Sequence, residues 1–383
     1  MRIAFDAKRA FQNTTGLGNY GCILFDRFAY DHPQHEYFLM TPRVTGNYTP
    51  PAVPNMHIVS PSGMGKVLPH AWRSNWVKKD LKRLGIQLYH GISHEIPVGI
   101  GHTGIRSIVT MHDLIFEYYP EQYKPIDVKI YRQKFKYACA NATHIIAVSK
   151  KTSDDLVALY KVPEEKITVC YPSCQPMYER LTDDTERDAI KRKYRLPEKY
   201  FLYVGSIIAR KNLLNICKAL HVLKDQVDTP LVVIGSGSGA YAQEVKAFVR
   251  EHGMDERVIF LNDRAEASDP GFSSSADFPA IYQSAHMLLF PALYEGFGLP
   301  VLEAMWSRVP VVTSNTSCLP ETGGDAAYYI DPLSVDELVS AILTINSNDI
   351  LRQQMIRKGI VHAQNFLPKV CAQRVMDVYE KIG

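Results

Sequence analysis

The sequence predicts an α/β protein with two Rossmann-like domains, whose parallel sheets face each other across a central cleft. Short β-branched runs alternate with amphipathic stretches along the whole chain, as expected for repeated βαβ units. This alternation stops once, between Tyr171 and Pro197, where prolines and a run of mixed charges interrupt it, and then resumes. The length of 383 residues also suits two domains, because one domain usually takes roughly 150 residues.

Each element is placed by its own local pattern. Strands are expected at short apolar and β-branched runs, namely 3–5, 37–40, 57–60, 88–90, 107–111, 144–148, 167–170, 200–204, 231–234, 257–261, 287–291 and 310–314. Helices are expected where apolar residues recur every three or four positions, namely 19–30, 74–84, 129–140, 149–160, 213–223, 240–252, 281–285, 301–307, 335–345 and 350–365. We expect domains over 1–175 and 176–365, a C-terminal helix within 366–383 that packs back on the first domain, and a flexible loop over 262–276.

The composition excludes several classes of protein. Apolar residues make up 46% of the chain and charged residues 22%, which excludes a disordered chain. A net charge of +3 gives no reason to expect a nucleic-acid partner, and no apolar run reaches the ~18 residues of a membrane-spanning helix. Seven cysteines at irregular spacing favour a reducing compartment. We therefore expect a cytoplasmic protein that touches the inner membrane face at most peripherally, through the basic segment 72–83.

A glycine-rich motif runs from Gly16 through Gly18 to Gly21. Its spacing is that of a dinucleotide-binding fingerprint, which keeps an NAD(P)-linked oxidoreductase as the alternative function. The context argues against it, because ten residues separate the motif from the first strand and Glu36 precedes the second strand instead of ending it. The remaining interpretation is an anion site, in which the backbone amides of a glycine turn before a helix approach a phosphate.

Two cations, Arg210 and Lys211, follow the strand 200–204, and Asn212 is expected to cap the helix after them. Cations at a helix N-terminus oppose the helix dipole. Such a local conflict is expected where a bound anion compensates it.

The strongest motif is Pro291–Met305, where an apolar strand runs into a glycine-rich turn and a helix. Glu295 opens the turn, and Glu303 is expected in the first turn of the helix that Pro300 begins. The glycines let several successive amides point at one anion, and these amides belong to Gly296, Phe297, Gly298 and Leu299. The carboxylates of Glu295 and Glu303 can accept hydrogen bonds from the hydroxyls of a sugar or ribose.

The strand 107–111 ends on His112, which would therefore face a ligand at the carboxyl edge of the sheet. There it could donate to a substrate hydroxyl or transfer a proton. The sequence contains no Asp-x-Asp, no phosphate-binding Gly-x-x-x-x-Gly-Lys loop and no Gly-x-Ser-x-Gly. We expect neither a metal nor another cofactor.

These motifs together resemble the retaining glycosyltransferases of family 4, which have the GT-B fold. The resemblance covers essentially the whole chain. It is carried by the Glu-x7-Glu element of Glu295 and Glu303, by Pro310-Val-Val-Thr-Ser-Asn315, Pro320-Glu-Thr-Gly-Gly-Asp325, Arg210-Lys211-Asn212, His112-Asp113-Leu114, Ala147-Val-Ser149 and Gly16-Leu-Gly18-Asn-Tyr20. The N-terminal half is similar to mannosyltransferase-like members that use GDP-mannose.

The resemblance implies a role for each motif. Domain 1–175 would face the acceptor and domain 176–365 would bind the nucleotide sugar. Arg210 and Lys211 would bind the diphosphate, Glu303 the ribose hydroxyls, and Glu295 with the amides of 296–299 the donor sugar and distal phosphate. Gly16 and Gly18 would approach the phosphates, and His112 the donor sugar near the reacting carbon.

The implied reaction transfers a hexose, with retention, to a glycan or a lipid-linked glycan in surface polysaccharide or glycoconjugate assembly. A sugar-binding scaffold without catalysis is a further alternative.

Overall fold

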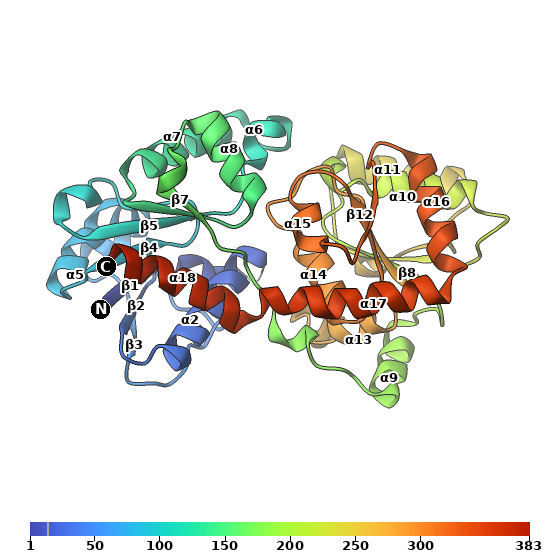
Figure 1. Ribbon diagram of the computed structural model, residues 1–383, viewed down its shortest axis with the longest axis horizontal. Coiled ribbons are helices and arrows are strands. Elements are labelled where there is room, and N and C mark those ends of the chain that lie inside the picture. Colours follow the sequence, from blue (N-terminus) through green and yellow to red (C-terminus); the bar gives the residue numbers. More distant parts are fainter. Residues whose placement is uncertain (14) are drawn as a thin grey trace. The chain divides into compact units, whose positions relative to one another are not determined.

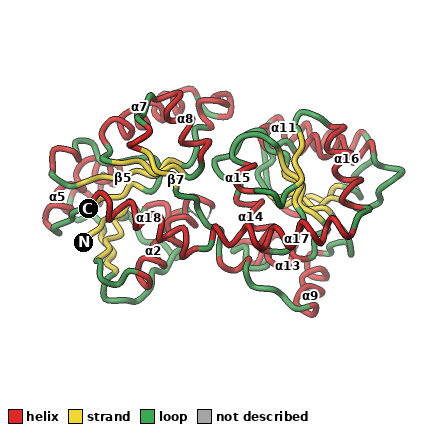
Figure 2. The backbone as a smooth tube through the Cα atoms, in the orientation of Figure 1, coloured by secondary structure: helices red, strands yellow, loops and turns green. Residues whose placement is uncertain are grey.

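The computed structural model describes residues 1–13 and 15–383, which form two compact units (Figure 1). Unit 1 comprises Met1–Gln175 together with Phe366–Gly383, and unit 2 comprises Pro176–Asn365. Each unit is a parallel sheet covered by helices, so the predicted α/β fold class is confirmed (Figure 2). None of the helices in the described part of the chain is long and apolar enough to cross a membrane.

In the described residues of unit 1, seven parallel strands pair in the order β3-β2-β1-β4-β5-β6-β7. They are β1 (Arg2–Asp6), β2 (Glu36–Met40), β3 (Met56–Val59), β4 (Leu88–Gly91), β5 (Arg106–Met111), β6 (His144–Ala147) and β7 (Ile167–Val169). The α-helices are α1 (Lys8–Gln12), α2 (Gly16–Asp31), α3 (Met64–Val67), α4 (Pro69–Ala71), α5 (Val77–Arg83), α6 (Ile115–Tyr118), α7 (Pro125–Asn141), α8 (Lys150–Tyr160) and α18 (Pro368–Ile382). A π-helical turn, η1 (Trp72–Trp76), precedes α5 and divides the helix expected at 74–84.

The C-terminal helix α18 packs beside α2 and completes the core of unit 1 (Figure 1). Its Tyr379 is fully buried and lies 5.6 Å from Phe28 and 6.4 Å from Phe5, between ring centroids. The Tyr379 hydroxyl also contacts Nδ1 of His90 on β4. Two distant parts of the chain therefore share one aromatic core.

In the described residues of unit 2, six parallel strands pair in the order β10-β9-β8-β11-β12-β13. They are β8 (Phe201–Val204), β9 (Leu231–Ile234), β10 (Val258–Phe260), β11 (Met287–Phe290), β12 (Val311–Ser314) and β13 (Tyr328–Ile330). The α-helices are α9 (Asp184–Tyr194), α10 (Leu213–Val222), α11 (Ala240–Glu251), α12 (Pro270–Ser273), α13 (Phe278–Gln283), α14 (Leu299–Trp306), α15 (Leu319–Gly323), α16 (Val335–Asn346) and α17 (Asp349–Ala363).

Two segments predicted to be irregular contain helical structure. The mixed-charge run expected to be irregular contains α9, whose N-cap Asp183 accepts a hydrogen bond from the amide of Glu186. The loop expected over 262–276 instead contains short helical turns, η8 (Ala265–Ser268) and α12. Lys193 on α9 pairs with both Asp269 and Asp277, at 2.7 Å each, and so ties this segment to the unit.

Each sheet has one topological switch point, which is the pair of neighbouring strands from which the chain continues toward opposite edges of the sheet. In unit 2, β8 and β11 are neighbours, and the chain leaves them in opposite directions across the sheet. In unit 1, β1 and β4 have the same relation. Ligands of open α/β sheets bind outside the carboxyl ends of the strands at such points.

Candidate functional site

The loops that follow β8 and β11 are joined at the switch point of unit 2. The amide of Leu293 donates to the Arg210 carbonyl at 2.8 Å. The side chain of Asn212 donates to the carbonyls of Pro291 at 3.1 Å and Pro332 at 2.7 Å. Asn212 is the N-cap residue of α10, as expected, but it has a left-handed backbone and its side chain makes no capping hydrogen bond to the helix. It instead fastens the turn η6 (Ala209–Lys211) to the loop after β11.

The two predicted cations meet the first glutamate of the Glu-x7-Glu element. Oε1 of Glu295 lies 2.6 Å from Nη1 of Arg210 and 2.7 Å from Nζ of Lys211. All three side chains are largely buried, and Nζ of Lys211 also lies 4.8 Å from the centre of the Phe290 ring. Burial raises the pKa of Glu295, but the nearby Lys211 and Arg210 outweigh it and hold the pKa below its ordinary value.

The ion-paired cluster has one carboxylate for two cations, and the nearby Glu303, whose pKa is about 7, is only partly charged at neutral pH, so a positive excess remains there. A buried charge excess of this kind is stabilised by an anion. A diphosphate presented at the same loops would complete the neutralisation. The Glu295 carboxylate meanwhile holds the two cations in place, a contact that the sequence analysis did not foresee.

The glycine-rich loop after Glu295 is held by residues that follow β12. Ser317 accepts a hydrogen bond from the Glu295 amide at 3.1 Å and donates to the Glu295 carbonyl at 2.9 Å. The Thr322 hydroxyl donates to the Phe297 carbonyl. These contacts place Gly296, Phe297, Gly298 and Leu299 at the N-terminus of α14, where the helix dipole favours an anion.

Position 298 of this loop requires a glycine. Its φ is +90°, and a Cβ there would lie 2.6 Å from Cδ2 of Leu319. We expect Gly298→Ala to cost about 1–3 kcal/mol of unfolding free energy, because an L-residue is strained in this conformation, and also to lower activity. Thermal unfolding measures the loss. Gly239→Ala is the matched control, since a Cβ there meets no atom within 4 Å, and an equal loss in both variants would contradict this account.

Glu303 points into the same site from α14. Its Oε2 accepts a hydrogen bond of 2.8 Å from the Tyr282 hydroxyl on α13. Burial raises the pKa of Glu303 to about 7, although Tyr282 and Lys211 act in the opposite direction. The helix begins at Leu299, so Pro300 is its second residue and Glu303 lies in its second turn, not its first. Glu303 therefore lies too far along the helix to offset its N-terminal dipole strongly, which favours a role in binding a ligand.

His112 follows β5 in unit 1. Its Nε2 donates to the Ile92 carbonyl at 2.8 Å, and its ring lies 4.9 Å edge-on from Tyr20. Burial, and then the neighbouring His94, lower the pKa of His112 to about 3, so the ring is neutral. The Nε2 proton of His112 is already donated to the Ile92 carbonyl, so His112 is not free to donate it to a substrate hydroxyl as predicted. The unprotonated Nδ1 can instead accept a hydrogen bond from a hydroxyl.

Gly16 and Gly18 lie in the first turn of α2 rather than in a loop before it. A Cβ at Gly18 would lie 1.9 Å from the Asn13 carbonyl oxygen, so this glycine permits close packing against the chain that follows α1. The Gly18 amide donates to Thr15 at 2.9 Å, and any anion contact would therefore fall to the amides that precede it. The helix α1 separates the motif from β1, which is not the arrangement of a dinucleotide fingerprint.

Unit 2 thus brings together Arg210, Lys211, Glu295, the loop 296–299 and Glu303, and unit 1 contains Gly16, Gly18 and His112. Four further residues position this machinery without having been predicted as site residues, namely Tyr282, Phe290, Ser317 and Thr322. Thr322 lies within the recognised 320–325 motif, but no local pattern marks Tyr282 or Ser317. Within residues 1–13 and 15–383, no three His, Cys, Asp or Glu side chains come together as a metal site requires.

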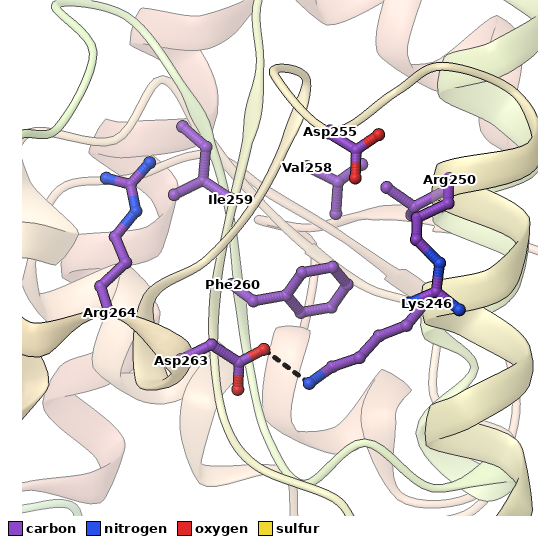
Figure 3. A pocket seen from close by; sticks show the side chains of 9 residues that line it. Lys246, Arg250, Asp255, Val258, Ile259, Phe260, Asp263 and Arg264 are labelled. Carbon is purple, nitrogen blue, oxygen red and sulfur yellow. Dashed lines mark hydrogen bonds and ion pairs between the residues drawn. The ribbon is translucent and has the colours of Figure 1, made fainter.

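A separate cavity of about 280 Å³ lies beside β10 and α11 (Figure 3). The Phe260 ring forms part of its wall, and an ion pair joins Lys246 and Asp263 beside it. None of the predicted site residues lines this cavity. This cavity is therefore distinct from the candidate site at the switch point of the sheet.

Two family models match the chain. The model described as "Glycosyl transferases group 1" matches residues 185–362, and "Glycosyltransferase Family 4" matches residues 29–174. Among similar proteins, the O-antigen chain mannosyltransferase B of Escherichia coli is 29% identical over 313 residues, which are 81% of this chain and 78% of that protein. The O-antigen chain mannosyltransferase RfbU of Salmonella typhimurium is 29% identical over 252 residues, 66% of this chain and 63% of that protein.

Solved structures share the fold over nearly the full length. Anabaena HepE, solved with UDP and glucose, has a TM-score of 0.74 at 15% identity and covers 100% of both chains. WaaG, a glycosyltransferase involved in lipopolysaccharide biosynthesis, has a TM-score of 0.68 at 17% identity and covers 99% of both. The fold is GT-B, as predicted.

Proposed function

Because this chain belongs to the family 4 glycosyltransferases with the GT-B fold, we propose that it transfers mannose from GDP-mannose to a glycan acceptor in O-antigen assembly. The observation that carries the proposal is the convergence of Arg210 and Lys211 on Glu295, close to Glu303. Paired cations suit a diphosphate, and carboxylates suit hydroxyls. Both O-antigen relatives described above are named mannosyltransferases, which supports mannose as the sugar.

The proposed reaction retains the anomeric configuration. The bond between the anomeric carbon and the diphosphate oxygen breaks, the acceptor oxygen bonds to that carbon on the same face, and the acceptor proton passes to the departing phosphate. The diphosphate gains charge in the transition state, and Arg210 and Lys211 stabilise it. Glu303 accepts from the ribose hydroxyls, Glu295 and the amides of 296–299 hold the sugar and distal phosphate, and neutral His112 accepts from a sugar hydroxyl through Nδ1.

A thermal-shift panel of GDP, UDP, ADP and dTDP tests the donor. A ligand at 100 times its dissociation constant adds ~2.7 kcal/mol to the unfolding free energy, so we expect GDP to give the largest shift. Selection of another nucleotide would exclude GDP-mannose, and no shift with any of them would contradict the proposed function. Titration with NADH is expected to leave protein fluorescence unchanged, whereas binding would favour the oxidoreductase. Donor hydrolysis without acceptor distinguishes an enzyme from a binding scaffold.

We also propose that the reaction needs no metal ion. The sequence has no Asp-x-Asp, and the cations of η6 can carry the charge that a metal would otherwise neutralise. Transfer activity is expected to persist in excess EDTA. Activity that is lost in EDTA and restored by a divalent cation would show this part of the mechanism to be wrong.

Peripheral membrane contact is proposed through α7. In the segment 72–83, Trp72 is buried, although Trp76, Lys79, Lys82 and Arg83 are exposed. On α7, Ile126 is 60% exposed and Ile130, one turn later, is 39% exposed. Lys124, Lys129 and Lys136 are exposed on or beside the same helix, which suits an anionic bilayer.

We expect the protein to sediment with phosphatidylglycerol vesicles more than with phosphatidylcholine vesicles. The double variant Ile126→Glu/Ile130→Glu is expected to lose this preference. Leu333→Glu/Ile350→Glu is the matched control, because both residues are more than 70% exposed and lie in unit 2. Equal sedimentation of all three proteins would contradict the assignment to α7.

A further inference from the structure

His112 is held in place by the loop that follows β4. The Ile92 carbonyl of this loop accepts the Nε2 proton of His112 at 2.8 Å. Nε2 of His94, two residues later, accepts the His112 amide at 2.9 Å. One bond thus holds the ring of His112, and the other holds its backbone. His94 is half-buried and has no part in the chemistry proposed above.

His94 contacts the end of β5 a second time, through its own backbone. Its amide donates to the Thr110 carbonyl at 3.0 Å. Its ring packs against Phe135 of α7, with 4.9 Å between the ring centroids. His94 therefore bonds to the chain on both sides of Met111, the last residue of β5, and is itself braced by a neighbouring helix.

The backbone of His94 is left-handed, with a φ of +66°. This conformation costs a residue with a Cβ about 1–2 kcal/mol, and asparagine or glycine adopts it more readily. Strain of this kind is typical of functional sites, where the surrounding contacts maintain it. A histidine at this position is explained by what its ring does, which is to accept the His112 amide.

The two imidazoles are in opposite tautomers. Burial, and then the charge of Arg9, lower the pKa of His94 to about 3, so its ring is neutral and Nε2 has a lone pair for the His112 amide. The proton of His94 is therefore on Nδ1. The proton of His112 is on Nε2, where the Ile92 carbonyl accepts it. Nδ1 of His112 is thus an acceptor for as long as the backbone of His112 stays in place.

We propose that His94 is a positioning residue for the transfer reaction, which holds the backbone of His112 so that Nδ1 accepts a hydroxyl of the donor sugar. This inference rests on the proposed function, in which His112 contacts that sugar. Without the bond from His94, the His112 backbone can turn, its ring can leave the Ile92 carbonyl, and the proton can move to Nδ1. The acceptor atom would then become a donor. A side chain that is already fixed in its productive geometry avoids this reorganisation when the substrate binds.

Two substitutions separate the ring of His94 from its backbone. Asparagine tolerates the left-handed conformation, but its side chain is too short to reach the His112 amide. Glutamine places an amide oxygen near the position of Nε2, where it can accept the same hydrogen bond. We expect His94→Asn to lower kcat/KM for the donor roughly tenfold, the loss of about one hydrogen bond. His94→Gln is expected to stay within about threefold of wild type. The control His102→Asn, at an exposed histidine of the same unit, is expected to change nothing.

A double-mutant cycle shows whether His94 acts through His112. His112→Ala removes the acceptor itself, so His94→Asn/His112→Ala is expected to have the same kcat/KM as His112→Ala alone. Losses that multiply would show that His94 acts by another route and would overturn the inference. An equal loss in His94→Asn and His94→Gln would overturn it as well, because the accepted hydrogen bond would then not be the cause.

The imidazole NMR signals of His112 test the same inference without any turnover. In protein labelled at its histidine nitrogens, protonated and unprotonated ring nitrogens have separate resonances, and His112→Gln identifies the pair that belongs to His112. We expect an unprotonated Nδ1 in wild type and in His94→Gln, and a mixture of tautomers in His94→Asn. An unchanged tautomer in His94→Asn would contradict the positioning role. His94→Gly, which also tolerates a positive φ, replaces His94→Asn if that variant fails to fold.

Failure of the proposed function has a different signature. The wild-type protein would then transfer no sugar from GDP-mannose or from a nucleotide sugar of whichever base the thermal-shift panel selects. The NMR comparison would still show whether His94 fixes the tautomer of His112.

Discussion

Lys211→Ala is expected to lower kcat by about 10²–10³-fold, which corresponds to ~2.7–4 kcal/mol of transition-state stabilisation. Nζ of Lys211 lies 2.7 Å from Glu295 in a largely buried cluster, where a charge acts more strongly than in water. The leaving diphosphate gains charge as the glycosidic bond breaks, so Lys211 stabilises the transition state more than the bound donor. Steady-state kinetics with GDP-mannose measures this difference.

Lys218→Ala is the control, since Lys218 is an exposed lysine on α10, seven residues further along the chain. Removing it changes net charge equally but leaves the cluster intact. A fall in kcat of less than about threefold for Lys211→Ala, which is ~0.7 kcal/mol, would show that Lys211 does not stabilise the leaving group.

Glu303→Gln is expected to weaken GDP-mannose binding on the order of tenfold and yet stabilise the fold. An amide accepts a weaker hydrogen bond from the ribose hydroxyls than a carboxylate does. Its oxygen can still accept the Tyr282 hydroxyl, which keeps the local packing. Calorimetry measures the affinity, and unchanged affinity would contradict the ribose role. Glu244→Gln on α11 is an exposed control.

The stabilisation depends on pH in a definite direction. The pKa of Glu303 is about 7 in the folded protein, above its ordinary value of 4.5. The folded state therefore binds this proton more tightly, and stability falls as pH rises from about 4.5 to 7. Glu303→Gln removes that loss, so its unfolding free energy is expected to exceed that of wild type by about 1–3 kcal/mol at pH 8 and to match it near pH 4.

The same titration is expected to appear in binding. Wild-type affinity for GDP-mannose should rise between pH 6 and 8, because the carboxylate is the better acceptor, and the affinity of Glu303→Gln should stay flat. GDP-mannose is the right probe, since its diphosphate diester does not titrate in this range whereas that of GDP does. A flat wild-type profile would contradict an elevated pKa at Glu303.

Much of the fold could be predicted because its strands are short, apolar and fully buried, as in β9 and β11. The edge strand β13 was missed, since two of its three residues are only half-buried and carry no strong apolar pattern. Helix α9 was missed because eight of its eleven residues are polar or charged. The start of α2 was placed three residues late because glycines are poor helix formers.

The site could be predicted only where its residues lie close together in the sequence. Arg210 and Lys211 are adjacent, and Glu295 and Glu303 share one short motif. The ion pairs between these two groups join residues about 85 positions apart, and neither local pattern contains information about the other. The same holds for Tyr282, whose contact with Glu303 depends on how α13 packs against α14.

The placement of α18 has a consequence for biosynthesis. Unit 1 begins with β1, but Val375, Met376 and Tyr379 of its core leave the ribosome only after all of unit 2 has been made. While translation continues, the nascent N-terminal segment has Phe5, Phe28 and Tyr37 without the helix that covers them. Unit 2, Pro176–Asn365, is one continuous segment and can complete its core first. The order of maturation would then be the reverse of the order of synthesis.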